Sequence, residues 1–346
     1  MSKHSYGQPI GLDVGTSRIV VAQKKENEIQ YESQLNAFVA VPNSKITEGV
    51  LEREKIPHVN LAGEIMIHGN ESDKFANLQN AETRRTMARG VLDAKEPEST
   101  RMLREILASM LGPGLGSGPG SGFGSGPSSS RQKLCFTVPA APLGAEDCLT
   151  YHEVTVRQIL TELGYDASSI NEGLAVIYAE LESSNYTGIG ISCGGGLCNV
   201  CLAYLSVPVV SFSVPKAGDF IDSSAATVTG ERATRIRLAK EDSFHFNGFY
   251  ADKIHQVLSV YYDDMIRSLV SALKDAFAGA KNAPKFPRPI PIVLSGGSAL
   301  PPGFRDRFER VLGKTGFPIA ISELRMAENP LHSTAKGALV YALSDL

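Results

Sequence analysis

The sequence contains no tryptophan, and its five cysteines are an odd number in a chain of 346 residues. Its N-terminus, MSKHSYGQPI, lacks the basic segment and apolar run of an export signal. No segment reaches the roughly 20 apolar residues that a membrane-spanning helix needs. These absences argue against a disulfide framework or a membrane protein, and they predict reduced cysteines in a cytoplasmic protein without direct membrane insertion.

An excess of charge of either sign is also missing. The 34 Lys and Arg residues nearly balance the 37 Asp and Glu residues, which gives a formal net charge of −3. Nothing in these totals predicts binding to nucleic acid or to an anionic membrane. With 42% hydrophobic residues, the chain is long enough for a substantial core and for about two domains.

Strand and helix patterns alternate along the chain. Ile and Val runs on either side of a Gly-Thr-Ser turn predict a hairpin over residues 9–23, and a strand-rich segment follows over about 29–69. The later patterns predict a helix at 100–111, a strand at 134–138, a helix opened by Thr150 and Glu153 and ended by Gly164, a helix from Asn171 to about 181, three strands over 188–213, helices over 222–241 and 251–280, a strand at 291–297, a helix at 303–313, a short strand near 318–321 and a closing helix from about 331. Alternation of this kind indicates an α/β fold with mixed sheets.

The composition changes abruptly at residues 112–130, GPGLGSGPGSGFGSGPSSS. This segment is almost entirely Gly, Ser and Pro, so it has too few apolar side chains to offset the entropy cost of ordering. We expect a flexible loop inside a domain.

Glycine-rich turns follow three predicted strands. Glycine lets backbone N–H groups approach an anion closely, so each turn could hold a phosphate or a sugar, although one such turn alone is more often purely structural. The turns are Asp13-Val14-Gly15-Thr16-Ser17, Ser192-Cys193-Gly194-Gly195-Gly196 and Ser295-Gly296-Gly297-Ser298.

Taken in order, these motifs resemble the nucleotide site of the actin, heat-shock chaperone and sugar kinase superfamily. The resemblance implies an actin-like (ribonuclease H-like) fold of two large domains, with mixed sheets flanked by helices and ATP or ADP bound between them. It implies that Asp13 reaches a Mg²⁺ ion through water and that Gly15, Thr16 and Ser17 hold phosphate. In INEGLAVIYAEL at 170–181 it implies that Glu172 positions the attacking water, although an Asn-Glu pair alone is more typical of a helix cap.

Four later segments carry the resemblance further. They are the second glycine turn, PKAGDFIDSSAA at 215–226, GERATRIRLAKE at 230–241 and PIVLSGGSALPPGF at 291–304. In addition, STAKGALVYAL at 333–343 resembles the second connecting helix of the family. The resemblance assigns nucleotide contacts to Gly194, Gly195, Gly196, Gly218, Asp219, Asp222, Arg237 in place of the family's lysine, Gly296, Gly297 and Ser298.

Residues 61–93 resemble the small domain of the filament-forming bacterial actins of the MreB and MamK type. This implies a first domain at 1–185, with its small subdomain at about 29–98, and a second domain at 186–346. A small subdomain at about 222–255 should be truncated, because only DSFHFNGFY separates Glu241 from Ala251. The implied partner is the chain itself in a head-to-tail filament, with an unknown cargo or adaptor.

The second glycine turn departs from the family pattern Asp-x-Gly-x-Gly-Thr-Thr-Asp. Ser192 replaces the first aspartate and Asn199 the last. Loss of a charge from such a site typically costs a factor of about 10² to 10³ in rate. We therefore expect nucleotide binding with slow or absent ATP hydrolysis.

Cys193, Cys198 and Cys201 have the spacing of three iron–sulfur ligands. No cysteine follows as a fourth ligand, and strand alternation would point Cys198 and Cys201 to opposite faces. We interpret them as small core residues. Two other functions stay open: a small-molecule kinase of the same superfold and a non-polymerising actin-like adaptor.

Overall fold

A glycine turn joins the first two strands of the first large sheet. The computed structural model describes residues 7–112, 131–142, 149–250, 252–279 and 286–344. Within the predicted hairpin, the Gly15 N–H donates to the Arg18 carbonyl at 3.0 Å and so closes a tight turn. Three antiparallel strands continue into two parallel ones, in the order β3-β2-β1-β8-β9. The strands are β1 (Ile10–Val14), β2 (Arg18–Lys25), β3 (Glu28–Leu35), β8 (Gln132–Val138) and β9 (Tyr165–Asn171).

The second large sheet has the same arrangement. Its order is β12-β11-β10-β13-β14, again with three antiparallel strands followed by two parallel ones. Its central strands are apolar and buried along their whole length, as expected of strands covered on both faces. The strands are β10 (Gly188–Cys193), β11 (Cys198–Tyr204), β12 (Val207–Val214), β13 (Ile290–Ser295) and β14 (Ile321–Met326).

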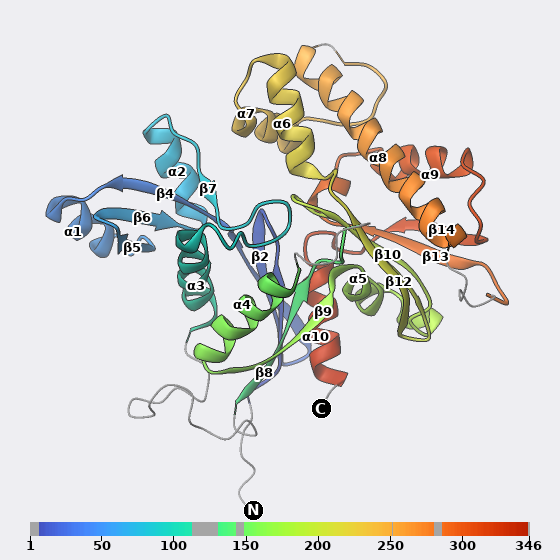
Figure 1. Ribbon diagram of the computed structural model, residues 1–346, viewed down its shortest axis with the longest axis horizontal. Coiled ribbons are helices and arrows are strands. Elements are labelled where there is room, and N and C mark those ends of the chain that lie inside the picture. The colour runs from blue at the N-terminus through green and yellow to red at the C-terminus, as the bar shows by residue number, and fades with distance from the viewer. Residues whose placement is uncertain (1–6, 113–130, 143–148, 251, 280–285, 345–346) are drawn as a thin grey trace, which may run out of the picture.

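A small third sheet extends from the first, at the left of Figure 1. Its order is β5-β6-β4-β7, with strands β4 (Ala37–Pro42), β5 (His58–Leu61), β6 (Glu64–His68) and β7 (Arg84–Arg85). Two short helices, α1 (Lys45–Arg53) and α2 (Asn70–Leu78), accompany it. The strand-rich prediction for 29–69 thus holds except at α1, where the Ser44 side chain accepts the Thr47 N–H as a helix cap.

Most of the remaining helices pack around the two large sheets. The remaining helices are α3 (Pro97–Leu111), α4 (Leu149–Glu162), α5 (Glu172–Glu180), α6 (Gly218–Thr229), α7 (Ala233–Asp242), α8 (Lys253–Gly279), α9 (Phe304–Gly313) and α10 (Ser333–Ser344), with 3₁₀ turns η2 (Glu182–Ser184) and η3 (Gly297–Ala299). Of these, α6 and α7 pack on each other and on α8. Within the described ranges, none of the helices combines the length and the apolar character needed to cross a membrane.

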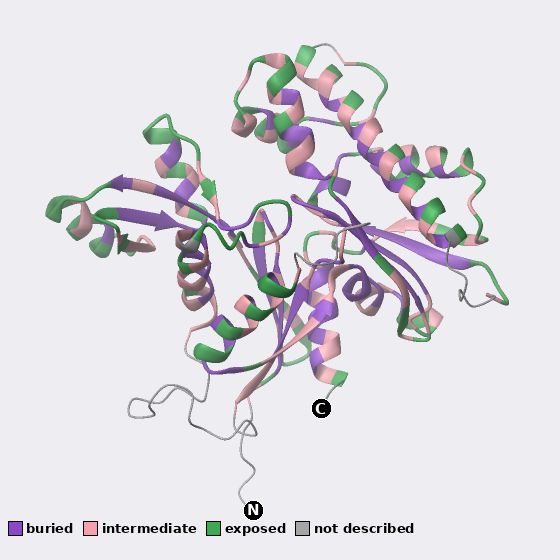
Figure 2. Cartoon of the chain, viewed as in Figure 1, coloured by how far each residue is buried: buried purple, intermediate pink, exposed green. Residues whose placement is uncertain are grey.

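Helices α5 and α10 lie against each other between the two large sheets (Figure 1). Helix α5 packs on β10 and β11 of the second sheet, whereas α10 packs on β1 and β8 of the first. Glycine permits this close approach: a Cβ at Gly337 of α10 would lie 1.8 Å from the Ala175 carbonyl oxygen of α5. The buried residues in Figure 2 concentrate along these central strands and helices. Each half of the chain is therefore anchored on the other.

Most predicted elements are confirmed, together with the mixed α/β architecture, and the departures have local causes. Strand β9 was not predicted, because YDASSIN shows neither an apolar run nor alternation. Thr150 lies inside α4 instead of capping it. The helix predicted over 222–241 is two helices, separated at Gly230, whose φ is +76°. The strand near 318–321 begins at Ile321.

The small subdomain predicted at about 222–255, the fourth subdomain of this fold, is reduced, as predicted. Helices α6 and α7 are present, and among the described residues from 243 to 252 no strand forms. Apart from Gly112, the Gly/Ser/Pro loop predicted at 112–130 lies outside the described residues.

The cysteines of the second sheet are core residues. Cys193 and Cys198 lie opposite each other in the register of β10 and β11, as free cysteines, and pack with the helices of the second half. Cys201 packs with α5 and α10 on the other face. All three are buried. No cluster of three or more metal-binding side chains occurs in the part of the chain that the structure describes.

Candidate functional site

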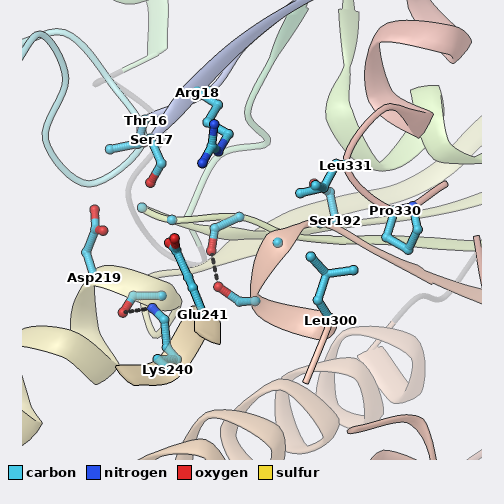
Figure 3. A pocket seen from close by; sticks show the side chains of 18 of the residues that line it. Thr16, Ser17, Arg18, Ser192, Asp219, Lys240, Glu241, Leu300, Pro330 and Leu331 are labelled. Carbon is cyan, nitrogen blue, oxygen red and sulfur yellow. Dashed lines mark hydrogen bonds between the residues drawn. The ribbon is translucent and has the colours of Figure 1, made fainter. Parts of the chain in front are cut away.

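A cleft of about 630 Å³ opens between the two large sheets. Figure 3 shows Ser17 and Arg18 on one side of it, with Asp219, Lys240 and Glu241 facing them from the other. The structure brings every residue of the predicted site to this cleft: Asp13, Gly15, Thr16, Ser17, Glu172, Gly194, Gly195, Gly196, Gly218, Asp219, Asp222, Arg237, Gly296, Gly297 and Ser298. What each does to a ligand stays a prediction.

Two glycine turns meet face to face in the cleft. A Cβ at Gly195 would lie 2.3 Å from Ser17 Oγ, and one at Gly196 would lie 2.5 Å from Thr16 Oγ1. Only glycine allows the turns to approach so closely. In the described part of the chain, no acceptor pairs with the backbone N–H groups of Thr16, Ser17, Gly195 and Gly196. The turns therefore offer unpaired backbone donors in the cleft, a group suited to an anion.

The second turn is fixed from its far side. The Gly218 and Asp219 N–H groups donate to the carbonyls of Gly194 and Gly195 at 3.1 and 2.8 Å, and Ser298 Oγ donates to the Gly194 carbonyl at 2.8 Å. These bonds tie the start of α6 and the turn after β13 to the second glycine turn. Three of the predicted motifs thus form one rigid wall of the cleft.

Two half-buried carboxylates lie at the floor of the cleft. Asp13, near the end of β1, accepts hydrogen bonds from Thr137 Oγ1 and Thr334 Oγ1, both at 2.6 Å. Glu172 begins α5, and its Oε2 accepts bonds from Ser192 Oγ at 3.2 Å and Asn199 Nδ2 at 2.9 Å. Asn171 caps α5 through its own side chain and so fixes where Glu172 stands.

Burial dominates the electrostatics of this pair. Burial raises the pKa of Asp13, and burial together with the nearby Asp13 charge raises the pKa of Glu172 to about 8. The charged forms are costly because two like charges share a site removed from water. A cation in the cleft would relieve that cost.

Ser192 changes the chemistry of the floor. Where the family pattern has a carboxylate, this chain has a hydroxyl that donates to Glu172. Asn199 likewise donates to Glu172, while its Oδ1 accepts the Ala140 N–H at 2.8 Å. The two substitutions replace repulsion by hydrogen bonds, so they orient Glu172 without adding negative charge.

Two basic residues of α7 are paired with acids at the cleft. Arg237 Nη2 donates to Asp73 Oδ2 of α2 at 2.9 Å, across the cleft. Lys240 Nζ lies 2.8 Å from Asp222 in a buried ion pair and also donates to the Gly218 carbonyl at 3.3 Å. Arg237 thus joins the small sheet's helix to the second half of the chain.

Sequence reasoning missed several residues that shape the site, namely Arg85, Thr137, Lys240 and Thr334. Arg85 and Thr334 lie in segments already matched by resemblance, RRTMARGVL and STAKGALVYAL, and Lys240 lies in GERATRIRLAKE. Their contacts come from elements far apart in the chain, which no local pattern reveals.

The architecture and the cleft define a protein with the actin fold. The structure is similar to that of a MamK double helical filament subunit at a TM-score of 0.70 and 16% identity, covering 97% of this chain and 98% of that one. MreB5 of Spiroplasma citri bound to AMPPNP matches at 0.64 and 14% identity, with 97% and 96% covered. EutJ from Carboxydothermus hydrogenoformans matches at 0.51 and 14% identity, with 96% and 89% covered.

The chain belongs to the Volactin family, whose model matches residues 9–342. No curated protein sequence is significantly similar to it. At these identities the structural matches establish the fold alone, and the predicted resemblance to actins of the MamK and MreB type is confirmed at that level.

Proposed function

We propose that this chain binds ATP or ADP with Mg²⁺ in the cleft and assembles with copies of itself into filaments. The observation that carries the binding proposal is the pair of facing glycine turns, whose four unpaired backbone N–H groups lie in the same cleft as two half-buried carboxylates. Unpaired backbone donors suit phosphate oxygens, and a carboxylate pair suits a cation. A nucleotide with its metal ion supplies both.

Mg²⁺ fits the floor as an ion held largely by water and phosphate. The hydroxyls of Thr137 and Thr334 already occupy one lone pair on each oxygen of Asp13, and Mg²⁺ commonly keeps several waters when it binds through one or two carboxylates. Bound there, the ion would neutralise phosphate charge. Asp13 orients it, and Glu172 positions the water that attacks the terminal phosphate.

Hydrolysis should be slow. Ser192 leaves the floor with Asp13 and Glu172, where the family pattern includes a further aspartate, and removal of one such electrostatic contact typically costs a factor of about 10² to 10³. The nucleotide then acts mainly as a structural ligand between the two halves. We take these halves to be the domains 1–185 and 186–346.

Self-assembly is proposed from the fold. A solved structure with this fold is a MamK double helical filament, and head-to-tail contacts build filaments when their rotation does not close. The reduced fourth subdomain removes a surface that other actins use between subunits, so the subunit contacts should differ.

Binding and assembly are tested separately. Isothermal titration with ADP and with the slowly hydrolysed analogue AMPPNP, each with Mg²⁺, should give one site per chain, and sedimentation with electron microscopy should reveal nucleotide-dependent filaments. The matched variant is Gly195→Val, which fills the meeting point of the two turns and should abolish binding. Absence of binding by the wild type would overturn the nucleotide proposal, and a chain that binds but stays monomeric would point to an adaptor or a kinase.

A further inference from the structure

Arg85 reaches from the small sheet into the meeting point of the two glycine turns. It lies on β7, and its Nη1 donates to Ser17 Oγ at 2.9 Å and to Asp219 Oδ1 at 2.6 Å. Ser17 belongs to the first turn, and Asp219 lies in the first turn of α6 beside the second. One guanidinium therefore connects three separate elements.

The contacts of Arg85 lie beside the two glycine turns, whose backbone N–H groups are unpaired among the described residues. A Cβ at Gly195 would lie 2.3 Å from Ser17 Oγ and 3.5 Å from Asp219 Oδ1, so both partners of Arg85 border the second turn directly. An anion held by the N–H groups of both turns would lie next to this guanidinium. The two cations of α7 that line the cleft are already held, Arg237 by Asp73 and Lys240 by Asp222.

The Arg85 guanidinium is only partly used. Both of its hydrogen bonds leave from Nη1, and among the described residues nothing accepts from Nη2 or Nε. A guanidinium binds carboxylates and phosphates through paired N–H groups. Its side chain is 24% exposed and that of Asp219 is 37% exposed, so the ion pair is screened by water and easily exchanged.

We propose that Arg85 is a specificity-determining residue that exchanges Asp219 for the terminal phosphate of a nucleoside triphosphate. The carboxylate of Asp219 occupies the guanidinium when no such phosphate is present. A triphosphate, which carries more charge at this point than a diphosphate, takes its place. Arg85 thereby distinguishes ATP from ADP and reports the difference to the small sheet. This inference rests on the proposed nucleotide binding.

The test compares affinities for AMPPNP and ADP, each with Mg²⁺, by isothermal titration. Arg85→Gln should weaken AMPPNP binding at least about 10-fold, since a charge-assisted bond to phosphate is lost, and change ADP binding less than about 2-fold. Retained ADP affinity also shows that the variant is folded. Asp219→Asn should strengthen AMPPNP binding more than ADP binding, because the internal competitor for Arg85 is gone.

A matched control lies next in the sequence. Arg84 is on the same strand but pairs with Glu98 at 2.7 Å, outside the cleft, so Arg84→Gln should leave the ratio of the two affinities unchanged. Arg18, exposed at the start of β2, also lines the cleft. If Arg18→Gln, and not Arg85→Gln, causes the selective loss, the proposal is overturned.

The remaining outcomes separate the two proposals. Equal loss of both ligands in Arg85→Gln, or no loss, overturns the role of Arg85 while nucleotide binding by the wild type stands. If the wild type binds neither ligand, both proposals fall. Should Arg85→Gln not fold, Arg85→Lys keeps the charge without the fork, and it should lose AMPPNP affinity selectively by a smaller factor.

Discussion

Substitution of Gly337 by alanine tests how tightly the two central helices are joined. The new Cβ would lie 1.8 Å from the Ala175 carbonyl oxygen, about 1.6 Å short of the 3.4 Å at which ordinary contact begins. The obstacle is backbone within α5, so no side chain can turn away. Overpacking of a core typically costs about 1–3 kcal/mol, and a backbone obstacle places this case at the upper end. Alanine's higher helix propensity returns about 1 kcal/mol, which leaves a net loss of about 2 kcal/mol or more.

The assay is urea unfolding followed by far-UV circular dichroism, since the chain has no tryptophan to report by fluorescence. Gly49→Ala is the matched control: Gly49 lies inside α1, and a Cβ there meets nothing within 4 Å, so the same change should stabilise that helix by up to about 1 kcal/mol. Thr334, one turn before Gly337, donates to Asp13, so Gly337→Ala should also weaken Mg²⁺–nucleotide binding. Unfolding of Gly337→Ala at the wild-type urea midpoint or above it would refute this reasoning.

Three further predictions concern polar side chains within the fold. Burial lowers the pKa of His152 from 6.5 to about 4, so stability present above pH 6.5 is lost as pH falls towards 4. His152→Asn, whose amide can still accept the Leu92 N–H, should flatten that part of a pH series of urea midpoints by up to about 3 kcal/mol. Lys240→Met leaves the Asp222 carboxylate buried and unpaired, and it should lower the unfolding free energy by about 3–5 kcal/mol; combining it with Asp222→Asn should restore most of that loss. Asn171→Ala removes the cap of α5 and should cost about 1 kcal/mol in thermal unfolding, and an unchanged melting temperature would contradict the capping role.

Local patterns predicted elements wherever the sequence carries its own signal. The hairpin of β1 and β2 has Ile and Val residues on either side of a glycine turn, and α5 has an Asn cap directly before it. Strand β9 carries no such local signal. Its position is set by parallel pairing with β8, where Tyr165 pairs with Gln132, 33 residues earlier in the chain. Helix α1 is short and lies among strands, so the segment was predicted as strand-rich and the Ser44 cap was not recognised as the start of a helix.

The candidate site divides in the same way. Its glycine turns could be placed from sequence because each is a contiguous motif, and all of them line one cleft. The hydroxyls that hold Asp13 come from residues 124 and 321 positions away in the chain. The partner of Arg237 is likewise remote, since Asp73 lies on a helix of the small sheet. Such pairings depend on how distant elements pack, which local periodicity does not encode.

The two large sheets share one strand order, so the two halves of the molecule repeat one topology. Each sheet presents the hairpin turn between its central strand and the next, Gly15–Ser17 in one half and Gly194–Gly196 in the other, and these turns touch. A phosphate group between them would contact backbone atoms at equivalent positions of both halves. Under the proposed nucleotide binding, loss of that phosphate would remove one link between the halves at a single point, while the packing of α5 on α10 still joins them.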